Sequence, residues 1–322
     1  MTQFIRIVSM LIACACVMGA ALAQKYPTRS VRVLVPQLPG DPCDTFGRLL
    51  GQRMGERLGQ QFIVDNRPGA SGTIGLALAA KAPADGYTIA CGQGGNMSVI
   101  PHTMKNVPYD ALKDFAPVAL IATNYLALVV HPSTPFKNVA EFIKYLKANP
   151  GKVAFASNGE GAFVHMATEL FRSHVGFTYL HVPFKGVPQM AQELMSGRVD
   201  AAFGSFTGMY PFITSGRVRL LGIAKETRAP NYPDLPTIAE TVPGFSSGGW
   251  FGFVAPANVP KDIIAVLNRE ANAAMKLPDV RAKLEALGLE VWTESPEYLA
   301  NLMKSEYDKY AKVARDIGLV PK

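Results

Sequence analysis

Residues 31–44, VRVLVPQLPGDPCD, predict a strand that runs through a Pro/Gly turn directly into a helix. The apolar run Val31–Val35 is typical of a buried strand. Asp41 is placed as the N-cap of the helix, Pro42 as its first residue, and Asp44 as an acidic residue in its first turn. Such a turn presents backbone N–H groups and the positive end of a helix dipole. The segment therefore predicts an anion-binding loop at the carboxyl edge of a sheet.

The same construction recurs at residues 153–165, VAFASNGEGAFVH. A strand, Val153–Ser157, leads through a glycine-containing turn into a helix, Phe163–Val175. Two such loops could face each other across a cleft and hold one small anion from both sides.

Strands and helices alternate along most of the chain, which predicts an α/β fold with parallel sheets and helical crossovers. The other expected strands are 61–65, 87–92, 179–182, 201–204 and 218–224. Two further apolar runs lie at 116–122 and 126–131, and an aromatic segment at 249–254. The helix that follows Asp41 is expected to extend over 45–58. The other expected helices are 74–81, 139–148, 188–196 and three that finish the chain, the last beginning at Ser295-Pro296.

The chain is long for a single core, which favours two lobes. The middle block, 125–248, has its own series of strands and helices and is flanked by 24–124 and 249–322. A domain inserted into another leaves two crossover segments, here near Ile121–Ala127 and Phe245–Gly252, and these would act as a hinge.

Residues 1–23 read as a secretory signal peptide. Arg6 precedes an uncharged apolar run, Ile7–Ala23, which ends in the cleavage pattern Ala21-Leu22-Ala23 before Gln24. A membrane anchor and lipoprotein processing at Cys14 are the alternatives. Cleavage would place the mature protein in the periplasm.

The net charge of +7 is scattered along the chain and no nucleic-acid motif is visible, so we expect an anionic small ligand and no nucleic-acid partner. The histidines show no metal-ligand spacing, and we expect no metal and no cofactor. Cys43 and Cys91 remain after cleavage, both at the ends of strands. They could pair in an oxidising compartment, but we interpret them as free thiols, because a chain this long can fold without a disulfide bond.

Nine segments together carry a resemblance to a known family: VPQLPGD (35–41), VDNRPGASG (64–72), ADGYT (84–88), YDALKDFAPVALIA (109–122), ASNGEGAFVH (156–165), HVPFKG (181–186), SGRVDAAF (196–203), DLPTIAE (234–240) and WFGFVAPANVP (250–260). In order and spacing the chain resembles the substrate-binding proteins of tripartite tricarboxylate transporters, also called Bordetella uptake gene (Bug) proteins. The resemblance covers nearly all of the mature chain. It implies a type II periplasmic-binding-protein fold, no catalysis, and delivery of a small organic carboxylate to membrane permease subunits.

The resemblance also implies a site in which one loop from each lobe holds the ligand carboxylate through backbone amides and small polar side chains. By position the two loops are Pro39–Asp44 and Ser157–Gly161, with lesser contributions from Gly92–Asn96, Phe184-Lys185 and Gly204-Ser205. The candidate ligand-binding residues are Pro39, Gly40, Asp41, Cys43, Asp44, Gln93, Asn96, Ser157, Asn158, Gly159, Gly161, His165, Lys185 and Ser205.

Asp41 stands where the family usually has a second glycine, and Ala162 replaces a small hydroxyl residue. An aspartate at this position can cap the helix with its own carboxylate and repels a second negative charge on a ligand. These departures favour a monoanion, or a ligand with an apolar or cationic second end, over a tricarboxylate.

Two other functions stay open. An enzyme on the same fold could use Cys43 as nucleophile and His165 as base, although no third orienting group can be named. The loaded protein could also signal to a membrane sensor kinase, on which the sequence is silent. We expect a monomer. The segment Gly69–Gly72 looks like a phosphate cradle but lacks the context of a nucleotide-binding motif, and we assign it no role.

Overall fold

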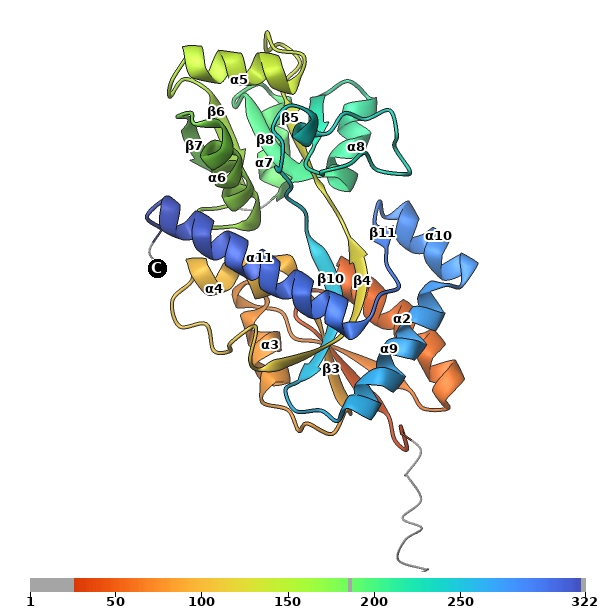
Figure 1. Ribbon diagram of the computed structural model, residues 1–322. Helices are drawn as coiled ribbons and strands as arrows, with labels where there is room; N and C mark the ends of the chain where they lie inside the picture. The colour runs from red at the N-terminus through yellow and green to blue at the C-terminus, as the bar shows by residue number, and fades with distance from the viewer. Residues whose placement is uncertain (1–25, 185–186, 320–322) are drawn as a thin grey trace, which may run out of the picture.

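The computed structural model describes residues 26–184 and 187–319, which form two α/β lobes, one above the other in Figure 1. The predicted signal peptide and Lys185 lie outside the described residues. Each lobe is built on one sheet with helices on both faces, as the alternation of strands and helices predicts.

The first lobe has a six-stranded sheet in the order β11-β4-β10-β3-β1-β2. Its strands are β1 (Val31–Val35), β2 (Phe62–Asn66), β3 (Thr88–Gln93), β4 (Phe115–Thr123), β10 (Trp250–Pro256) and β11 (Glu290–Val291). Side chains alternate across β1, so Val31, Val33 and Val35 pack on one face and Leu34 on the other. The first face is covered by α2 (Pro42–Leu58), α9 (Lys261–Met275) and α10 (Pro278–Ala286), and the second by α3 (Thr73–Ala80) and α11 (Pro296–Asp316).

The second lobe has a five-stranded sheet in the order β7-β6-β8-β5-β9. Its strands are β5 (Leu126–Val130), β6 (Ala154–Ser157), β7 (Leu180–Pro183), β8 (Ala201–Ser205) and β9 (Arg219–Ile223), and its helices are α5 (Val139–Ala148), α6 (Phe163–Val175), α7 (Val187–Met195) and α8 (Phe206–Thr214). Phe142, Phe155, Phe171 and Phe203 are fully buried in one core that all of these strands share.

The expectation of parallel sheets holds only in part: β1 pairs parallel with β2 and β3, and β6 with β7 and β8, but both sheets are mixed. β10 runs antiparallel to both β3 and β4, and β5 runs antiparallel to both β8 and β9. The reason is the passage between lobes: β4 leads directly out of the first sheet into β5, and β10 returns in the opposite direction, so neither step uses a helical crossover.

The two segments that connect the lobes, at Asn124 and at Gly248-Gly249, are hydrogen-bonded to each other. The Asn124 N–H donates to the carbonyl oxygen of Gly249 (2.9 Å), and the Gly249 N–H donates to Asn124 Oδ1 (2.7 Å). A Cβ atom on Gly248 would lie 2.3 Å from the carbonyl oxygen of Asn124, so only glycine allows this approach.

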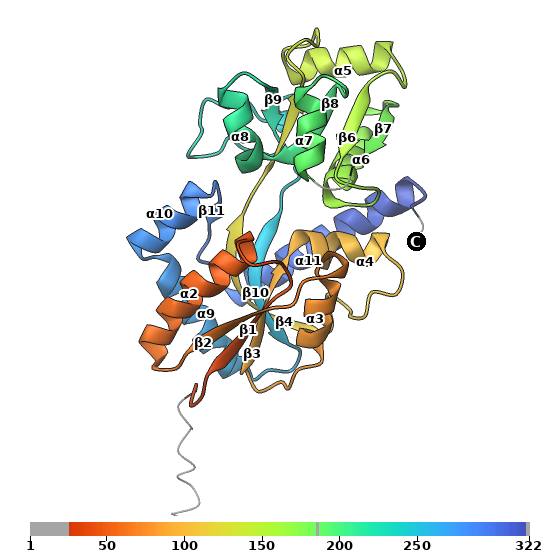
Figure 2. The same ribbon diagram turned by 180° about the vertical axis from the view of Figure 1, so that it is seen from behind.

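Helix α11 joins the two lobes a second time. Its first half places Leu299 and Met303 in the core of the first lobe, while Tyr310 and Val313 lie in the core of the second. Figures 1 and 2 show the helix running along the junction of the two lobes. Within the described residues no helix is both long enough and apolar enough to cross a membrane.

Candidate functional site

A cavity of about 350 Å³ lies between the lobes. In the first lobe its walls come from the loops that follow β1 and β2 and from the helical segments η2 (Gly95–Val99) and α4 (Ile100–Thr103) that follow β3. In the second lobe they come from the loop that follows β6 and from the first residue of α6. These are the carboxyl ends of strands, where ligands of α/β proteins bind.

Three helix N-termini meet at this cavity. The N-cap residues of α2, α3 and α6 are Asp41, Gly72 and Ala162, and all three line it. None of the three makes a side-chain cap hydrogen bond. Pro42, the first residue of α2, has no N–H, and the Thr73 N–H of α3 donates to the Ala70 carbonyl oxygen. Because the first N–H groups of a helix have no partner within the helix, the remaining first-turn N–H groups of these ends supply donors and positive dipole potential to one space. The arrangement favours an anion.

Three side-chain amides add further polar groups to the wall. Gln37 has both amide atoms buried and unpartnered within the described part of the chain, and the same holds for Asn96 Nδ2 and Asn158 Oδ1. Asn96 is 1% exposed, and its Oδ1 accepts the Gln93 N–H at 3.1 Å, which leaves Nδ2 as the unsatisfied donor. Buried polar groups without partners are costly, so a ligand that satisfies them is stabilised.

The Gly69–Gly72 segment belongs to this wall, although its role was not predicted. Gly69, Ser71 and Gly72 line the cavity, and all four residues have positive φ, including Ala70 (45°) and Ser71 (56°). Positive φ at consecutive non-glycine residues is rare and concentrates at functional sites. The sequence signal was available: PGASG stands between β2 and α3, in the same way that PGD stands between β1 and α2.

Asp41 occupies the N-cap position of α2 as predicted, but its carboxylate does not cap the helix. Asp41 Oδ2 accepts the N–H of Leu38 at 3.2 Å instead, because the side chain turns back over its own loop. The expectation that it would occupy the donors of α2 is therefore wrong. Its negative charge does line the cavity.

Asp44 is buried beneath the loop and does not line the cavity. It accepts the Gly40 N–H at 2.9 Å and is bound by Arg48 and Asn66. Burial alone would raise the pKa of Asp44, but these hydrogen bonds outweigh it and hold the pKa below its usual value. The Gly40 N–H, expected to serve the ligand, is thus engaged by Asp44.

Cys43 and Cys91 form a disulfide, and the expectation of free thiols is wrong. Their Cα atoms are 5.9 Å apart. β1 and β3 are neighbours in the sheet, so the first turn of α2 lies against β3, which the sequence alone does not reveal. The bond ties α2 to the strand that leads to Gln93, and an exported protein is the class in which such bonds persist.

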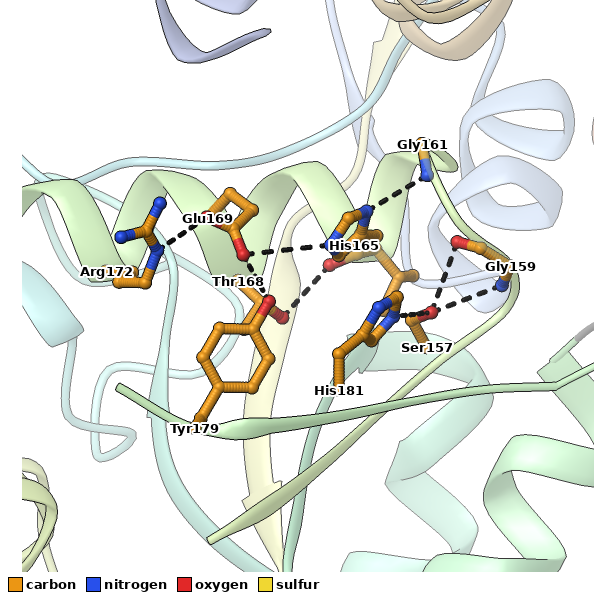
Figure 3. A network of polar contacts seen from close by, with 10 residues as sticks. Ser157, Gly159, Gly161, His165, Thr168, Glu169, Arg172, Tyr179 and His181 are labelled. Atoms are coloured by element: carbon orange, nitrogen blue, oxygen red, sulfur yellow. Dashed lines mark hydrogen bonds and ion pairs between the residues drawn. The ribbon is translucent and has the colours of Figure 1, made fainter. Parts of the chain in front are cut away.

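The loop after β6 contributes the predicted Asn158, and also Ala162, to the cavity, while the predicted residues Ser157, Gly159 and Gly161 do not line it. The Gly161 N–H donates to His165 Nδ1 at 2.9 Å, and the Gly159 N–H donates to Ser157 Oγ at 3.2 Å (Figure 3). These two N–H groups have partners within the protein.

Of the fourteen predicted ligand-binding residues, the cavity brings together Asp41, Gln93, Asn96 and Asn158. Nine others lie outside its wall: Pro39, Gly40, Cys43, Asp44, Ser157, Gly159, Gly161, His165 and Ser205.

Comparison with known proteins agrees with this arrangement. Residues 46–319 match the family described as the tripartite tricarboxylate transporter family receptor. The chain belongs to this family. It is 38% identical over 307 residues to the UPF0065 protein in the tcbD-tcbE intergenic region of Pseudomonas sp. strain P51, covering 94% of this chain and 91% of that one. It is 32% identical to protein BugT of Bordetella pertussis, covering 99% and 98% of the two chains.

The same likeness extends to solved structures. R. palustris Rpa4515 with adipate superimposes with a TM-score of 0.77 at 34% identity, covering 92% of this receptor and all of that chain (100%). The receptor therefore has the bilobal fold of periplasmic binding proteins.

The enzyme hypothesis loses its two residues in this receptor. In the first lobe, Cys43 Sγ is bonded to Cys91. In the second lobe, His165 Nδ1 accepts the Gly161 N–H. Within residues 26–184 and 187–319, no group of three or more His, Cys, Asp or Glu side chains is placed to hold a metal ion.

Proposed function

We propose that this protein is a periplasmic receptor that holds one small organic carboxylate between its lobes and delivers it to the permease of a tripartite transporter. The observation that carries the proposal is the meeting of three helix N-termini, those of α2, α3 and α6, at one cavity. The adipate bound to the R. palustris relative supports a carboxylate as the ligand class.

The cavity wall favours a ligand with a single negative charge. Among the described residues of the wall there is no lysine or arginine, and Asp41 contributes a carboxylate. Helix ends and the Asn96 amide can stabilise one carboxylate through hydrogen bonds and dipole potential, whereas a second carboxylate would lie near Asp41 without a cation. Leu38, Val99, Ile100 and Phe163 give the ligand an apolar wall for its remaining atoms. We therefore expect a monocarboxylate with an uncharged body.

Ligand binding would close the two lobes. We assign the lobes to 24–124 plus 249–322 and to 125–248, except that the second half of α11 packs in the core of the second lobe. The hinge lies at the paired segments around Asn124 and Gly249. A carboxylate that contacts both the α2–α3 side and the α6 side binds the closed form better, and that difference in affinity shifts the equilibrium toward closure.

A thermal-shift screen of organic acids tests the proposal. A ligand that binds only the folded protein raises the melting temperature by mass action. We expect monocarboxylates such as hexanoate to raise it, with one ligand bound per monomer in calorimetry and no product formed on prolonged incubation. Turnover of the bound acid, or no response to any carboxylate, would contradict the proposal.

Export is tested separately. Cleavage after Ala23 should give a periplasmic protein whose first residue is Gln24. N-terminal sequencing that begins at a lipid-modified Cys14 would show lipoprotein processing instead.

A further inference from the structure

Two histidine rings stand behind the loop that closes the second-lobe side of the cavity. His165, in the first turn of α6, and His181, on β7, stack with their ring centres 4.0 Å apart and their planes within 3° (Figure 3). His165 Nδ1 accepts the Gly161 N–H, and His181 Nε2 lies 2.7 Å from Ser157 Oγ. Together the rings hold both ends of the loop that carries Asn158 into the cavity.

The contact with Gly161 fixes the protonation state of His165. An N–H group can only donate, so Nδ1 must be unprotonated, and the neutral ring carries its hydrogen on Nε2. That nitrogen faces Glu169 Oε1 at 3.7 Å. A proton added to Nδ1 would place two donors against each other, and the contact with Gly161 would be lost.

The surroundings of His165 keep the ring neutral. His165 is buried, with 7% of the residue exposed, and the ring of His181 stacks on its ring. Glu169 faces it on α6, but that carboxylate is already bound by Arg172 (Nε–Oε2 2.6 Å) and by the hydroxyl of Tyr179. Burial is the largest effect, His181 and Arg172 add to it, and Glu169 and Glu160 oppose it; the result lowers the pKa of His165 to about 4.

We propose that His165 is a positioning residue, which holds the loop of Gly159 and Gly161 in its binding shape only while Nδ1 is unprotonated. The inference rests on the proposed function, because the loop matters for the ligand only if the ligand binds in the cavity. Protonation then releases the Gly161 N–H, the loop leaves its position, and the carboxylate ligand is released in acid.

The first test needs no ligand. In NMR spectra of the whole ¹⁵N-labelled protein, His165 should be the Nε2–H tautomer at neutral pH, and the Gly161 amide resonance should move with the same midpoint as the His165 ring. A Gly161 amide that stays unchanged while His165 titrates would overturn the proposal.

The second test uses hexanoate as the probe and His165→Asn as the variant. Asparagine Oδ1 can take the place of Nδ1 as acceptor, but it does not titrate. With a midpoint near pH 4, the neutral fraction at pH 3.5 predicts a loss of affinity of about fourfold for the wild type relative to His165→Asn. Protonation of hexanoate itself affects both proteins equally and cancels.

His174→Asn is the matched control, since this exposed histidine lies on the same helix and, among the described residues, its ring is hydrogen-bonded to the Leu170 carbonyl oxygen and touches Phe245 but not the loop. The pH dependence of hexanoate affinity in His174→Asn should follow that of the wild type. Parallel pH curves for wild type and His165→Asn, with circular dichroism showing both folded, would overturn the proposal. If His165→Asn does not fold, the Gly161 amide titration of the wild type still decides the role of His165. The same titration decides it if hexanoate does not bind at any pH. Only the failure of hexanoate to bind counts against the proposed function.

Discussion

Removing the charge of Asp41 should widen the specificity of the receptor toward dicarboxylates. Asp41 is the one acidic side chain on the described cavity wall, and no lysine or arginine of that wall balances it. Among the described residues its carboxylate accepts one backbone N–H, that of Leu38, and it does not cap α2. Asp41→Asn keeps the size of the side chain and removes the charge, while Asp41→Gly removes both.

The size of the effect follows from the cavity. A volume of about 350 Å³ corresponds to a sphere about 9 Å across, so a second ligand carboxylate lies within roughly that distance of Asp41. Two unit charges about 9 Å apart repel by about 2 kcal/mol at an effective dielectric constant of about 20, and by about 0.5 kcal/mol in water. An intermediate value of about 1 kcal/mol predicts an affinity gain of about fivefold.

The assay compares adipate with hexanoate, which have the same number of carbon atoms and differ by one carboxylate. Calorimetry should show that Asp41→Asn improves the affinity for adipate relative to hexanoate by about fivefold. Asp262→Asn, at the exposed start of α9, removes the same net charge elsewhere and should leave the ratio unchanged. An unchanged adipate-to-hexanoate ratio in Asp41→Asn would refute the assignment of Asp41 as a selectivity residue.

Three further perturbations test the structure around the cavity. Replacing both Cys43 and Cys91 with serine opens a loop whose ends are 48 residues apart. Urea unfolding should show that the free energy of unfolding falls by about 2–4 kcal/mol while the fold is retained. Labelling of two free thiols in the unfolded, unreduced wild type would contradict the disulfide. Gly159 has a φ of +131°, which valine adopts only with strain, so Gly159→Val should cost about 1–3 kcal/mol and abolish both ligand binding and the compaction on ligand addition seen by small-angle scattering. A Gly159→Val protein that still binds and compacts would show that this loop is not part of the clamp. Because the pKa of Asp44 is lowered in the folded state, its carboxylate stabilises the fold above the ordinary carboxyl pKa of about 4, and this stabilisation is lost as pH falls through the lower folded-state pKa. The melting temperatures of wild type and Asp44→Asn should therefore converge at low pH. A difference in melting temperature that persists at low pH would refute the stabilising role of the Asp44 carboxylate.

Much of the fold was predictable because its signals are local. The strand Val31–Val35 and the helix Phe163–Val175 have the predicted bounds, and Asn138 caps α5 through the Glu141 N–H as its spacing predicts. Helix α8 was missed because Gly208 and Pro211 within it are typical of a turn; its helical state depends on packing in the second lobe.

The site was predictable only in part, because its assembly depends on which loops become neighbours. The loops after β1 and β6 were identified from strand–turn–helix patterns, but the loop after β2 was set aside although its helix opens on the same cavity. The pairing of Cys43 with Cys91 requires β1 and β3 to be adjacent. The engagement of the Gly40 and Gly161 N–H groups by Asp44 and His165 depends on side-chain geometry that no pattern encodes.

The central claim is that a ligand carboxylate lies where α2, α3 and α6 begin. A crystal structure of the receptor with hexanoate tests it most directly. We predict that the carboxylate oxygens lie about 2.7–3.2 Å from Asn96 Nδ2 and from backbone N–H groups at these helix ends, with the alkyl chain against Phe163 and Ile100. A carboxylate bound outside the cavity, or an alkyl chain in place of the carboxylate at the three helix ends, would contradict it.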